Sequence, residues 1–298
     1  MKDFKNMPIS MKLNTDYSEK VQYDHTDYPI YIRRDLLSHY PNFTAPNHWH
    51  ADIEMIAVIS GEMKYNVNGK KLLLKSGEGI FVNAEQMHYG YSDTGTECDF
   101  ICILLHPMLL CSSLSYEQDF ILPLIRNSRM PFVLLHSETS WQREIYDQIR
   151  FLYEKRDTRT APLRILSSFS NIWLLLYENM PADDSQDTRQ DRDLTITKDM
   201  VGFIQKNYTR KLSLADISAS GSVGQSKCCR LFSRYFSQTP TMYLNQYRLN
   251  KSIELLRNTD LMITEIALSV GFGGASYFAE TFRKWAGMSP TKFRKKLL

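Results

Sequence analysis

The sequence contains no long apolar run, which argues against a helical membrane protein. No stretch approaches the roughly 18 consecutive apolar residues that a membrane-spanning helix requires. Residues 1–12 are polar and contain no hydrophobic core of a signal peptide. We therefore expect a cytoplasmic protein.

Cysteine is scarce and is arranged neither for disulfides nor for a metal site. The chain has five cysteines, an odd number. Metal sites built from cysteine use two spaced pairs, whereas Cys228 and Cys229 are adjacent and Cys98 and Cys102 have no second pair. We expect reduced thiols.

The net charge is only +3, but it is unevenly distributed. From Leu194 onward the sequence has 16 Lys or Arg and 6 Asp or Glu, a net charge of +10, which leaves −7 for residues 1–193. A length of 298 residues allows two domains, and the 43% hydrophobic content is typical of globular proteins. This charge separation predicts that only the C-terminal domain meets a polyanion.

The pattern between residues 54 and 135 predicts an antiparallel β-barrel or double sheet. Short apolar runs alternate with turns, and Asn68-Gly69 between two runs predicts a hairpin, because both positions of a tight turn favour positive φ. Residues 1–45 show no sustained period. We expect strands at 55–59, 63–67, 72–74, 80–82, 100–105 and 132–135.

Two helices are predicted after this region, at 139–156 and 162–180. A capping box beginning at Thr139 marks the start of the first. The second carries two apolar stripes, although one contact with a barrel requires only one. The surplus stripe, Ile165, Ile172 and Leu175, is either the seam of a dimer or part of a helix buried on both sides.

Residues 194–298 contain an internal repeat with an offset of 49 to 50 residues. Three segments recur in order: 214–218 matches 263–267, 230–234 matches 280–284, and 239–243 matches 289–293. In the second copy, two helical stripes between 263 and 285 meet at a glycine-containing corner. The repeat predicts a doubled helix-turn-helix.

Local signals mark the ends of these helices. Ser213 can cap the opening helix of the first copy, with Asp216 at its third position, whereas Met262 at the equivalent place in the second copy cannot cap. Gly271 suits the left-handed position just past a helix end, where a residue with a Cβ is strained. A connecting helix is expected at 241–256.

These residues resemble the AraC/XylS family of bacterial transcription regulators, and the resemblance covers nearly the whole C-terminal domain. In this family, each unit places one recognition helix in the major groove, and successive grooves are about 34 Å apart. The segments that carry it are 214–217 (LADI), 230–232 (RLF), 247–249 (YRL), 255–259 (LLRNT), 263–267, 271–272 (GF), 276–278 (SYF), 282–284 (FRK), 287–290 (GMSP) and 293–294 (FR).

The resemblance implies which residues of the first unit contact DNA: Gln225, Ser226, Lys227, Cys229 and Arg230. Ser226, Cys229 and Arg230 share one helix face by their spacing, while Cys228 and Leu231 are expected to face the core. Arg230 can make a two-pronged contact with guanine. A phosphate contact or an ion pair inside the domain is the alternative.

The corresponding DNA-contacting positions in the second unit are Ala275, Ser276, Ala279, Glu280 and Arg283. Glu280 stands where relatives often have Arg. It can accept a hydrogen bond from cytosine, or be a solvated surface residue. Because the two alanines offer only methyl contacts, we expect the second unit to read DNA weakly.

The N-terminal domain resembles the cupin barrel. His48, His50 and Glu54, followed by Gly61, fit the first cupin motif, and His88 stands where the second motif has its histidine. On a strand, the even spacing of the first three side chains directs them to one side, which we expect to be the barrel interior.

Three interpretations of these residues stay open. Three imidazoles and a carboxylate suit a divalent transition metal. However, Asn83 and Glu85 replace the Pro and Gly of the cupin motif, and regulators of this family often use such histidines to hydrogen-bond an effector without metal. Simple packing in the barrel is the third. We predict an effector site without metal, lined by His48, His50, Glu54, Tyr65, Phe81, His88 and Tyr91.

The sequence thus predicts an α+β protein of two domains. Residues 1–180 are expected to form a cupin-like antiparallel β-barrel with a helical hairpin, which binds the effector and dimerises. Residues 181–193, with five Asp and no large apolar side chain, are the predicted linker, and 194–298 the all-α double helix-turn-helix domain.

The predicted function is sequence-specific regulation of transcription, without catalysis and without a cofactor. We expect an activator that responds to a small molecule such as a sugar, binds double-stranded DNA as a homodimer and contacts RNA polymerase. The alternatives are a metal-dependent cupin enzyme fused to a DNA-binding module, and a repressor without a small ligand.

Overall fold

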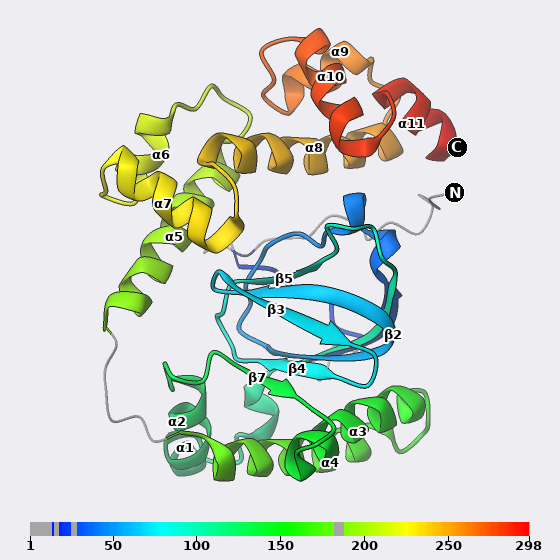
Figure 1. The fold of residues 1–298 in the computed structure, drawn as a ribbon, viewed down its shortest axis with the longest axis vertical. Coiled ribbons are helices and arrows are strands. Elements are labelled where there is room, and N and C mark those ends of the chain that lie inside the picture. The colour runs from blue at the N-terminus through cyan, green and yellow to red at the C-terminus, as the bar shows by residue number, and fades with distance from the viewer. Residues whose placement is uncertain (1–13, 15–17, 25–28, 182–187, 298) are drawn as a thin grey trace. The chain divides into compact units, whose positions relative to one another are not determined.

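The computed structural model describes residue 14 and residues 18–24, 29–181 and 188–297. The chain divides into two compact units, one formed mainly by residues 43–188 and the other mainly by residues 189–297 (Figure 1). The first, which we call the sheet unit, is antiparallel, and the second, the helical unit, contains only helices. The predicted α+β class is confirmed. None of the described helices combines the length and the hydropathy needed to cross a bilayer.

The strands of the sheet unit are all antiparallel to their neighbours. They follow the order β1-β6-β2-β4-β7, with β3 and β5 also paired to β2. Their bounds are β1 (Ile30–Leu36), β2 (Ile53–Val67), β3 (Lys70–Lys75), β4 (Gly79–Val82), β5 (His88–Tyr91), β6 (Cys98–Leu105) and β7 (Phe132–Leu135).

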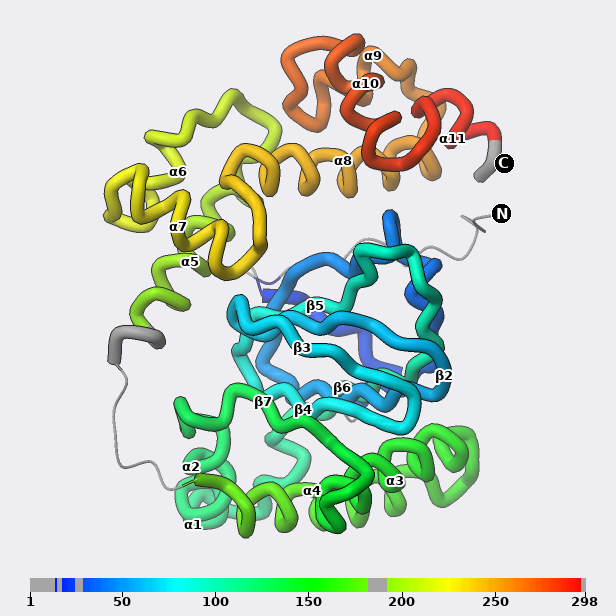
Figure 2. The backbone as a smooth tube through the Cα atoms, in the orientation of Figure 1, coloured from blue at the N-terminus to red at the C-terminus, as the bar shows by residue number. Residues whose placement is uncertain are grey.

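Strand β2 is the central strand of this sheet, because four other strands pair with it. The sequence predicted two separate strands here, but the structure has one strand of 15 residues with a register shift between Val58 and Ser60. Figure 2 follows the chain from β2 through a tight turn into β3. Asn68 and Gly69 have φ of 51° and 86°, so the predicted hairpin is confirmed.

Strands β1 and β5 were missed by the sequence analysis. In β1, Ile30 and Ile32 are buried, but the consecutive Arg33 and Arg34 are exposed and break the alternation expected of a strand. Strand β5 contains one histidine, two tyrosines and a glycine, so it has no aliphatic run to recognise. Both are specified by pairing with partners far along the chain.

Helices α3 (Ser140–Lys155) and α4 (Ala161–Asn179) lie against each other and cover one face of the sheet. Ile145 and Ile149 of α3 and Ile172 of α4 belong to the hydrophobic core between these two helices and the sheet, and each residue is 0% exposed. The sequence left open whether the surplus apolar stripe of α4 forms a dimer seam or is buried within the domain. Ile165 and Ile172 of this stripe are buried within the sheet unit.

The predicted capping box at α3 is wrong, because Thr139 makes no side-chain cap and Gln142 accepts a hydrogen bond from the His136 backbone instead.

Short helical segments connect the longer elements between residues 37 and 125. The short segments are η2 (Leu37–His39), η3 (Pro41–Phe43), η4 (Pro107–Leu110), α1 (Leu114–Tyr116), η5 (Glu117–Ile121) and α2 (Leu122–Ile125).

Two helix-turn-helix pairs joined by a long helix make up most of the helical unit. The first pair is α6 with α7, the second is α9 with α10, and α8 connects them. Part of the predicted linker, 182–187, lies outside the described residues, and its last residues are already helical. The bounds are α5 (Thr188–Asn207), α6 (Leu214–Ser220), α7 (Gln225–Phe236), α8 (Pro240–Asn258), α9 (Ile263–Ser269), α10 (Ala275–Ala286) and α11 (Pro290–Leu297).

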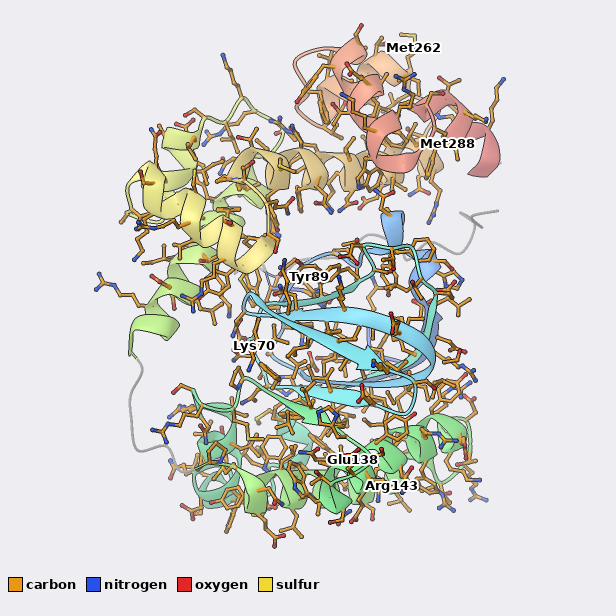
Figure 3. The ribbon with its side chains drawn as sticks, in the orientation of Figure 1. Lys70, Tyr89, Glu138, Arg143, Met262 and Met288 are labelled. Carbon is orange, nitrogen blue, oxygen red and sulfur yellow. The ribbon has the colours of Figure 1, made fainter. Side chains whose placement is uncertain are left out.

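The two pairs begin with different caps. Ser213 caps α6 as predicted, and the Asp216 carboxylate in turn accepts a hydrogen bond from the Ser213 backbone N–H, which completes a reciprocal capping box that the sequence analysis did not predict. Met262, labelled in Figure 3, offers no side-chain cap at α9, as predicted. The Glu265 carboxylate nevertheless accepts a 2.7 Å hydrogen bond from the Met262 backbone N–H, so one half of the capping box is kept.

Gly271 forms the corner after α9. Its φ of 86° confirms the predicted left-handed conformation. A Cβ atom at this position would lie 2.2 Å from the backbone oxygen of Tyr208, which no side chain tolerates. Glycine is therefore required twice, by the backbone conformation and by the close approach of a neighbouring segment.

Candidate functional site

Helix α7 has an exposed polar face that is the first part of the candidate DNA interface. Gln225, Ser226 and Arg230 are exposed, while Cys228 and Leu231 are buried on the opposite side. This is the division of faces that the sequence predicted. The exposed positions lie on the first turns of the helix that follows the turn, as expected for a recognition helix.

The positive charges of α7 differ in their surroundings. Lys227, half-buried like its neighbour Cys229, lies 2.8 Å from one carboxylate oxygen of Asp193 in α5, and Arg234 lies 3.8 Å from the other. In the part of the chain that the structure describes, the side chain of Arg230 has no hydrogen bond or ion pair. Arg230 is therefore available to an external partner.

Asp193→Asn should strengthen DNA binding modestly, because it removes a negative charge beside Lys227 and Arg234. A partly exposed ion pair contributes up to about 1 kcal/mol, so we expect a gain of at most about fivefold in affinity. Fluorescence anisotropy with a labelled DNA duplex measures the effect at fixed salt. Weaker binding by the variant would show that Asp193 holds Lys227 in a productive position.

Helix α10 presents the corresponding face of the second pair. Ser276, Glu280 and Arg283 are exposed, whereas Ala275 and Ala279 are half-buried. Glu280 lies 2.7 Å from Lys284 one turn later, and the hydrogen bond from this lysine lowers the pKa of the Glu280 carboxyl. The pair is solvent-exposed, which favours the surface role for Glu280 over contact with a base.

A second group of polar side chains converges inside the sheet unit. His48 and His50 precede β2, Glu54 is the second residue of β2, and His88 begins β5. An isolated antiparallel bridge pairs His48 with His88 and brings these segments together. We call these four residues the histidine site. Three of its side chains are buried, and that of His48 is 14% exposed.

Tyr65 joins the histidine site because β2 contains a bulge. In a regular strand, Glu54 and Tyr65 would face opposite sides, since they are an odd number of residues apart. The register shift between Val58 and Ser60 inserts one residue and returns Tyr65 to the same side. Its hydroxyl donates a hydrogen bond to Glu54 Oε1, and its ring stacks on that of His88 with centroids 6.3 Å apart.

Backbone carbonyl groups fix the orientation of all three imidazoles. The Nδ1 atoms of His48, His50 and His88 lie 2.9, 3.0 and 2.8 Å from the carbonyl oxygens of residues 46, 52 and 86. Because a carbonyl oxygen only accepts, each neutral ring carries its proton on Nδ1. The Nε2 atom of a neutral His50 then keeps a free lone pair, whereas the Nε2 atoms of His48 and His88 each lie 3.2 Å from a carboxylate oxygen, of Glu19 and Glu54 respectively.

Glu54 lies between two of the rings. Its Oε2 is 3.2 Å from His88 Nε2 and 3.5 Å from His50 Nε2. The longer separation does not meet hydrogen-bond geometry, so the buried His50 Nε2 has no hydrogen-bond partner among the described residues. Burial opposes the charge on Glu54, but the two histidines outweigh it and hold the pKa of this carboxyl well below its usual range.

The pKa values of His48 and His50 are shifted in opposite directions because their neighbours differ. Burial, reinforced by His88 and His50, lowers the pKa of His48 well below its usual value. Burial also opposes the charge on His50, but the Glu54 carboxylate outweighs it and raises the pKa of His50. The site therefore combines an anionic carboxylate with a neutral imidazole at His48.

Glu19 is a neighbour of the site that the sequence analysis missed. Its Oε2 atom lies 3.2 Å from His48 Nε2, and its backbone N–H donates to the Trp49 carbonyl oxygen. Burial raises the pKa of the Glu19 carboxyl to about 7. No pattern in residues 1–45 signals this contact, because it depends on the chain passing beside the segment that precedes β2.

Phe81 and Tyr91 were predicted to line the site, but the structure places both elsewhere. Phe81 is the register partner of Met55, so its side chain points into the core beneath α3 and α4, on the face opposite the histidine site. Tyr91 is the register partner of Lys64 and also faces away. The structure brings together the five other predicted residues.

The histidine site has the donor atoms of a metal centre. One donor atom from each of its four residues lies within 4.8 Å of the other three, with nitrogen from the imidazoles and oxygen from the carboxylate. The same atoms can instead accept hydrogen bonds from the hydroxyl groups of an organic ligand. The residues present therefore fit either kind of ligand.

Comparison with known proteins assigns each unit to a described domain. The family model described as an AraC-like ligand binding domain matches residues 36–139. A second model, described as a helix-turn-helix domain, matches residues 217–296. Together the two ranges cover more than half of the chain, one containing the histidine site and the other both recognition helices.

Curated relatives align over nearly the whole length. The HTH-type transcriptional regulator YdeC of Bacillus subtilis is 26% identical, covering 98% of this chain and 99% of its own. The melibiose operon regulatory protein of Escherichia coli is 26% identical over 90% and 89%. The transcriptional activator RhaS of Klebsiella pneumoniae is 24% identical over 86% and 89%. Among solved structures, ToxT from Vibrio cholerae matches with a TM-score of 0.46 and 18% identity, over 91% of this chain and 98% of ToxT.

Proposed function

We propose that a ligand bound at the histidine site controls how the two helix-turn-helix pairs bind promoter DNA. The proposal starts from the family, because this chain belongs to the AraC family of DNA-binding transcription regulators. The observation that carries this proposal is the presence in one chain of a buried polar site and of two exposed recognition faces. A ligand regulates only if its affinity differs between two arrangements of the protein.

Activation in response to a sugar is the form of regulation that we propose. One relative is named for the melibiose operon, and melibiose is a sugar, while another is named a transcriptional activator. Imidazole and carboxylate groups such as those of the histidine site hydrogen-bond sugar hydroxyls. Activation further implies contact with RNA polymerase in the cytoplasm of a bacterium. The alternative is a repressor without a small ligand.

A homodimer formed through α4 is also part of the proposal. Leu163, Leu166 and Leu174 are 72%, 45% and 51% exposed, and their spacing places them on one face of the helix. Clustered exposed apolar side chains mark interaction surfaces. A second copy of the chain offers the same face, as a two-fold symmetric interface requires.

The rival function is a metal-dependent enzyme that uses the histidine site. The relatives aligned over most of this chain are transcription regulators, which supports a regulatory role. The two functions differ in the fate of the ligand, since an enzyme converts it and a regulator releases it unchanged. Quantifying each candidate ligand by NMR before and after incubation with the protein separates them.

DNA affinity of the full-length protein should fall steeply with salt. The region from Leu194 onward has a net charge of +10, and cations that neutralise phosphates release counterions on binding. With 6 to 10 phosphate contacts, affinity should fall by about 10³-fold or more between 50 and 200 mM salt. Anisotropy titrations at four salt concentrations measure the slope. A flat response would contradict the proposed DNA interface.

Ligand control is tested by repeating the titration with a panel of monosaccharides and disaccharides. At least one sugar should change the DNA affinity, and His88→Gln should abolish its effect. His136→Gln is the matched control, because this histidine is on the surface and pairs with Glu78 away from the histidine site. A response that survives His88→Gln would place the sugar elsewhere in the chain.

A further inference from the structure

We propose that the chain between α5 and α6 is a second connection between the two helix-turn-helix pairs, in addition to α8, and that Arg248 of α8 is the positioning residue that holds it. We call residues 208–210 the inter-pair segment. The role of Arg248 rests on the proposed function, because it concerns how the recognition helices α7 and α10 meet DNA together. Two helices fixed at one distance and one rotation accept half-sites at one spacing only.

Helix α8 is the first connection between the pairs. It runs from the first pair to the second and contacts helices of both (Figure 1). Two bodies that are joined along a single helix can still rock about it, whereas a contact at a second point removes that freedom. The inter-pair segment provides this second point.

The inter-pair segment leads into the first pair and contacts the second. It ends three residues before Ser213, the cap of α6. The backbone oxygen of Tyr208 lies against Gly271, the corner of the second pair, where an added Cβ would be 2.2 Å from this oxygen. The backbone carbonyl of Thr209 is 2.9 Å from the same position. Only a glycine at this corner allows the segment to approach so closely.

Helix α5, which precedes the inter-pair segment, packs against the first pair. Gly221 is the C-cap of α6, and an added Cβ there would lie 2.7 Å from the side chain of Met200 and 3.1 Å from that of Ile196. Met200 is 0% exposed. The inter-pair segment is therefore anchored to the first pair on both sides, by α5 before it and by α6 after it.

Arg248 ties the inter-pair segment to α8. Its Nε and Nη2 atoms each donate a 2.8 Å hydrogen bond, to the backbone oxygens of Tyr208 and Arg210. Because the guanidinium group is a rigid fork, two such bonds fix the direction of the segment as well as its position. Arg248 is only 8% exposed, so water competes little for these bonds.

Aromatic rings surround the guanidinium group of Arg248. Its Cζ atom lies 5.8 Å from the ring centroid of Phe272, the buried residue that follows the corner glycine of the second pair. The rings of Tyr208 and Tyr247 pack edge to face, with centroids 5.2 Å apart. Among the described residues, no carboxylate forms an ion pair with Arg248. The two carbonyl groups are therefore the contacts that compensate the buried charge.

The test uses the full-length protein and a DNA site selected by the wild type. Three duplexes are compared, in which the half-sites have the selected separation or one base pair more or less. One base pair moves a half-site by about 3.4 Å and rotates it by about 35°. The wild type should bind the two altered duplexes at least about tenfold more weakly, because one recognition helix loses its contacts.

Arg248→Met should reduce this tenfold ratio by at least about threefold, because it removes both hydrogen bonds to the inter-pair segment. Replacement of a buried charged group by an apolar one is often neutral for stability, so the variant should stay folded, which thermal unfolding checks. Arg248→Lys keeps the charge but lacks the fork, so it should give an intermediate ratio. If Arg248→Met does not fold, the ratio of Arg248→Lys decides.

Lys251→Met is the matched control, because Lys251 is also on α8 but pairs with Glu254 of the same helix. Its ratio should equal that of the wild type. Equal weakening of all three duplexes by Arg248→Met would show a general loss of binding and overturn the positioning role, as would a wild-type ratio in the folded Arg248 variants.

Failure of the inter-pair connection is distinguishable from failure of the proposed function. A wild type that binds its selected site and tolerates all three spacings equally would reject the rigid connection and retain DNA binding by two recognition helices. A wild type that binds no duplex would reject the proposed function, and the role of Arg248 with it.

Discussion

Ile172→Asp is expected to unfold the sheet unit, whereas Leu174→Asp, two residues along the same helix, should leave it folded and abolish the dimer. Ile172 is 0% exposed in the core between α4 and the sheet. Burying an unpaired carboxylate there, together with the loss of the aliphatic side chain, costs more than about 4 kcal/mol. That is a large fraction of the stability of a typical domain.

The two variants are distinguished by urea denaturation and sedimentation. Ile172→Asp should show a lower denaturation midpoint or no folded baseline, and Leu174→Asp should unfold like the wild type but sediment as a monomer. A folded Ile172→Asp monomer would mean that Ile172 faces a partner and not the core. A Leu174→Asp dimer would place the interface on another surface.

Arg230→Ala is expected to cause the second large effect, a loss of base discrimination in one half of the DNA site. Arg230 is exposed on α7 and has no partner within the described protein. A two-pronged contact between arginine and guanine contributes about 1–3 kcal/mol of discrimination. Competition binding against every single-base variant of a selected site measures the change at each position.

Arg283→Ala on α10 is the informative comparison, because it removes an exposed arginine from the weaker reading face. It should lower affinity by a similar factor on all sequences, as expected for a phosphate contact. A uniform loss for Arg230→Ala as well would assign Arg230 to the phosphate backbone, and would leave base reading to Gln225 and Ser226.

The two helix-turn-helix pairs and the helix that connects them could be predicted from the sequence, whereas α5 and α11 were missed. The helices of the two pairs repeat with a period of 49 to 50 residues, and their apolar faces and corner glycine are local signals. Gly271 illustrates this, since its left-handed conformation follows from its place after a helix. The close approach of Tyr208 to Gly271 could not be predicted, because it depends on tertiary packing.

The histidine site could be predicted only in part. His48, His50 and Glu54 follow from even spacing on a strand, and the structure brings them together with His88. Phe81 was misplaced because the side that a residue faces depends on strand register, which the sequence does not show. Tyr65 lies in the site only because a bulge inserts one residue into β2.

Two further features could not be predicted from sequence patterns: the contact of Glu19 with the histidine site, and which side of α4 is buried. Glu19 reaches His48 from a segment without periodicity. In α4, apolar residues occur on several sides of the helix, so hydrophobicity alone could not tell the buried Ile172 from the exposed Leu174. Which side of α4 is buried depends on how the helix packs against the sheet.

Selection of bound sequences from a random DNA library with the purified full-length protein tests the central claim most directly. The account predicts one enriched site with two half-sites about one helical turn apart, roughly 34 Å, on the same face of the duplex. Base preference should be stronger in the half-site contacted by α7 than in that contacted by α10. Recovery of no enriched sequence would contradict the account.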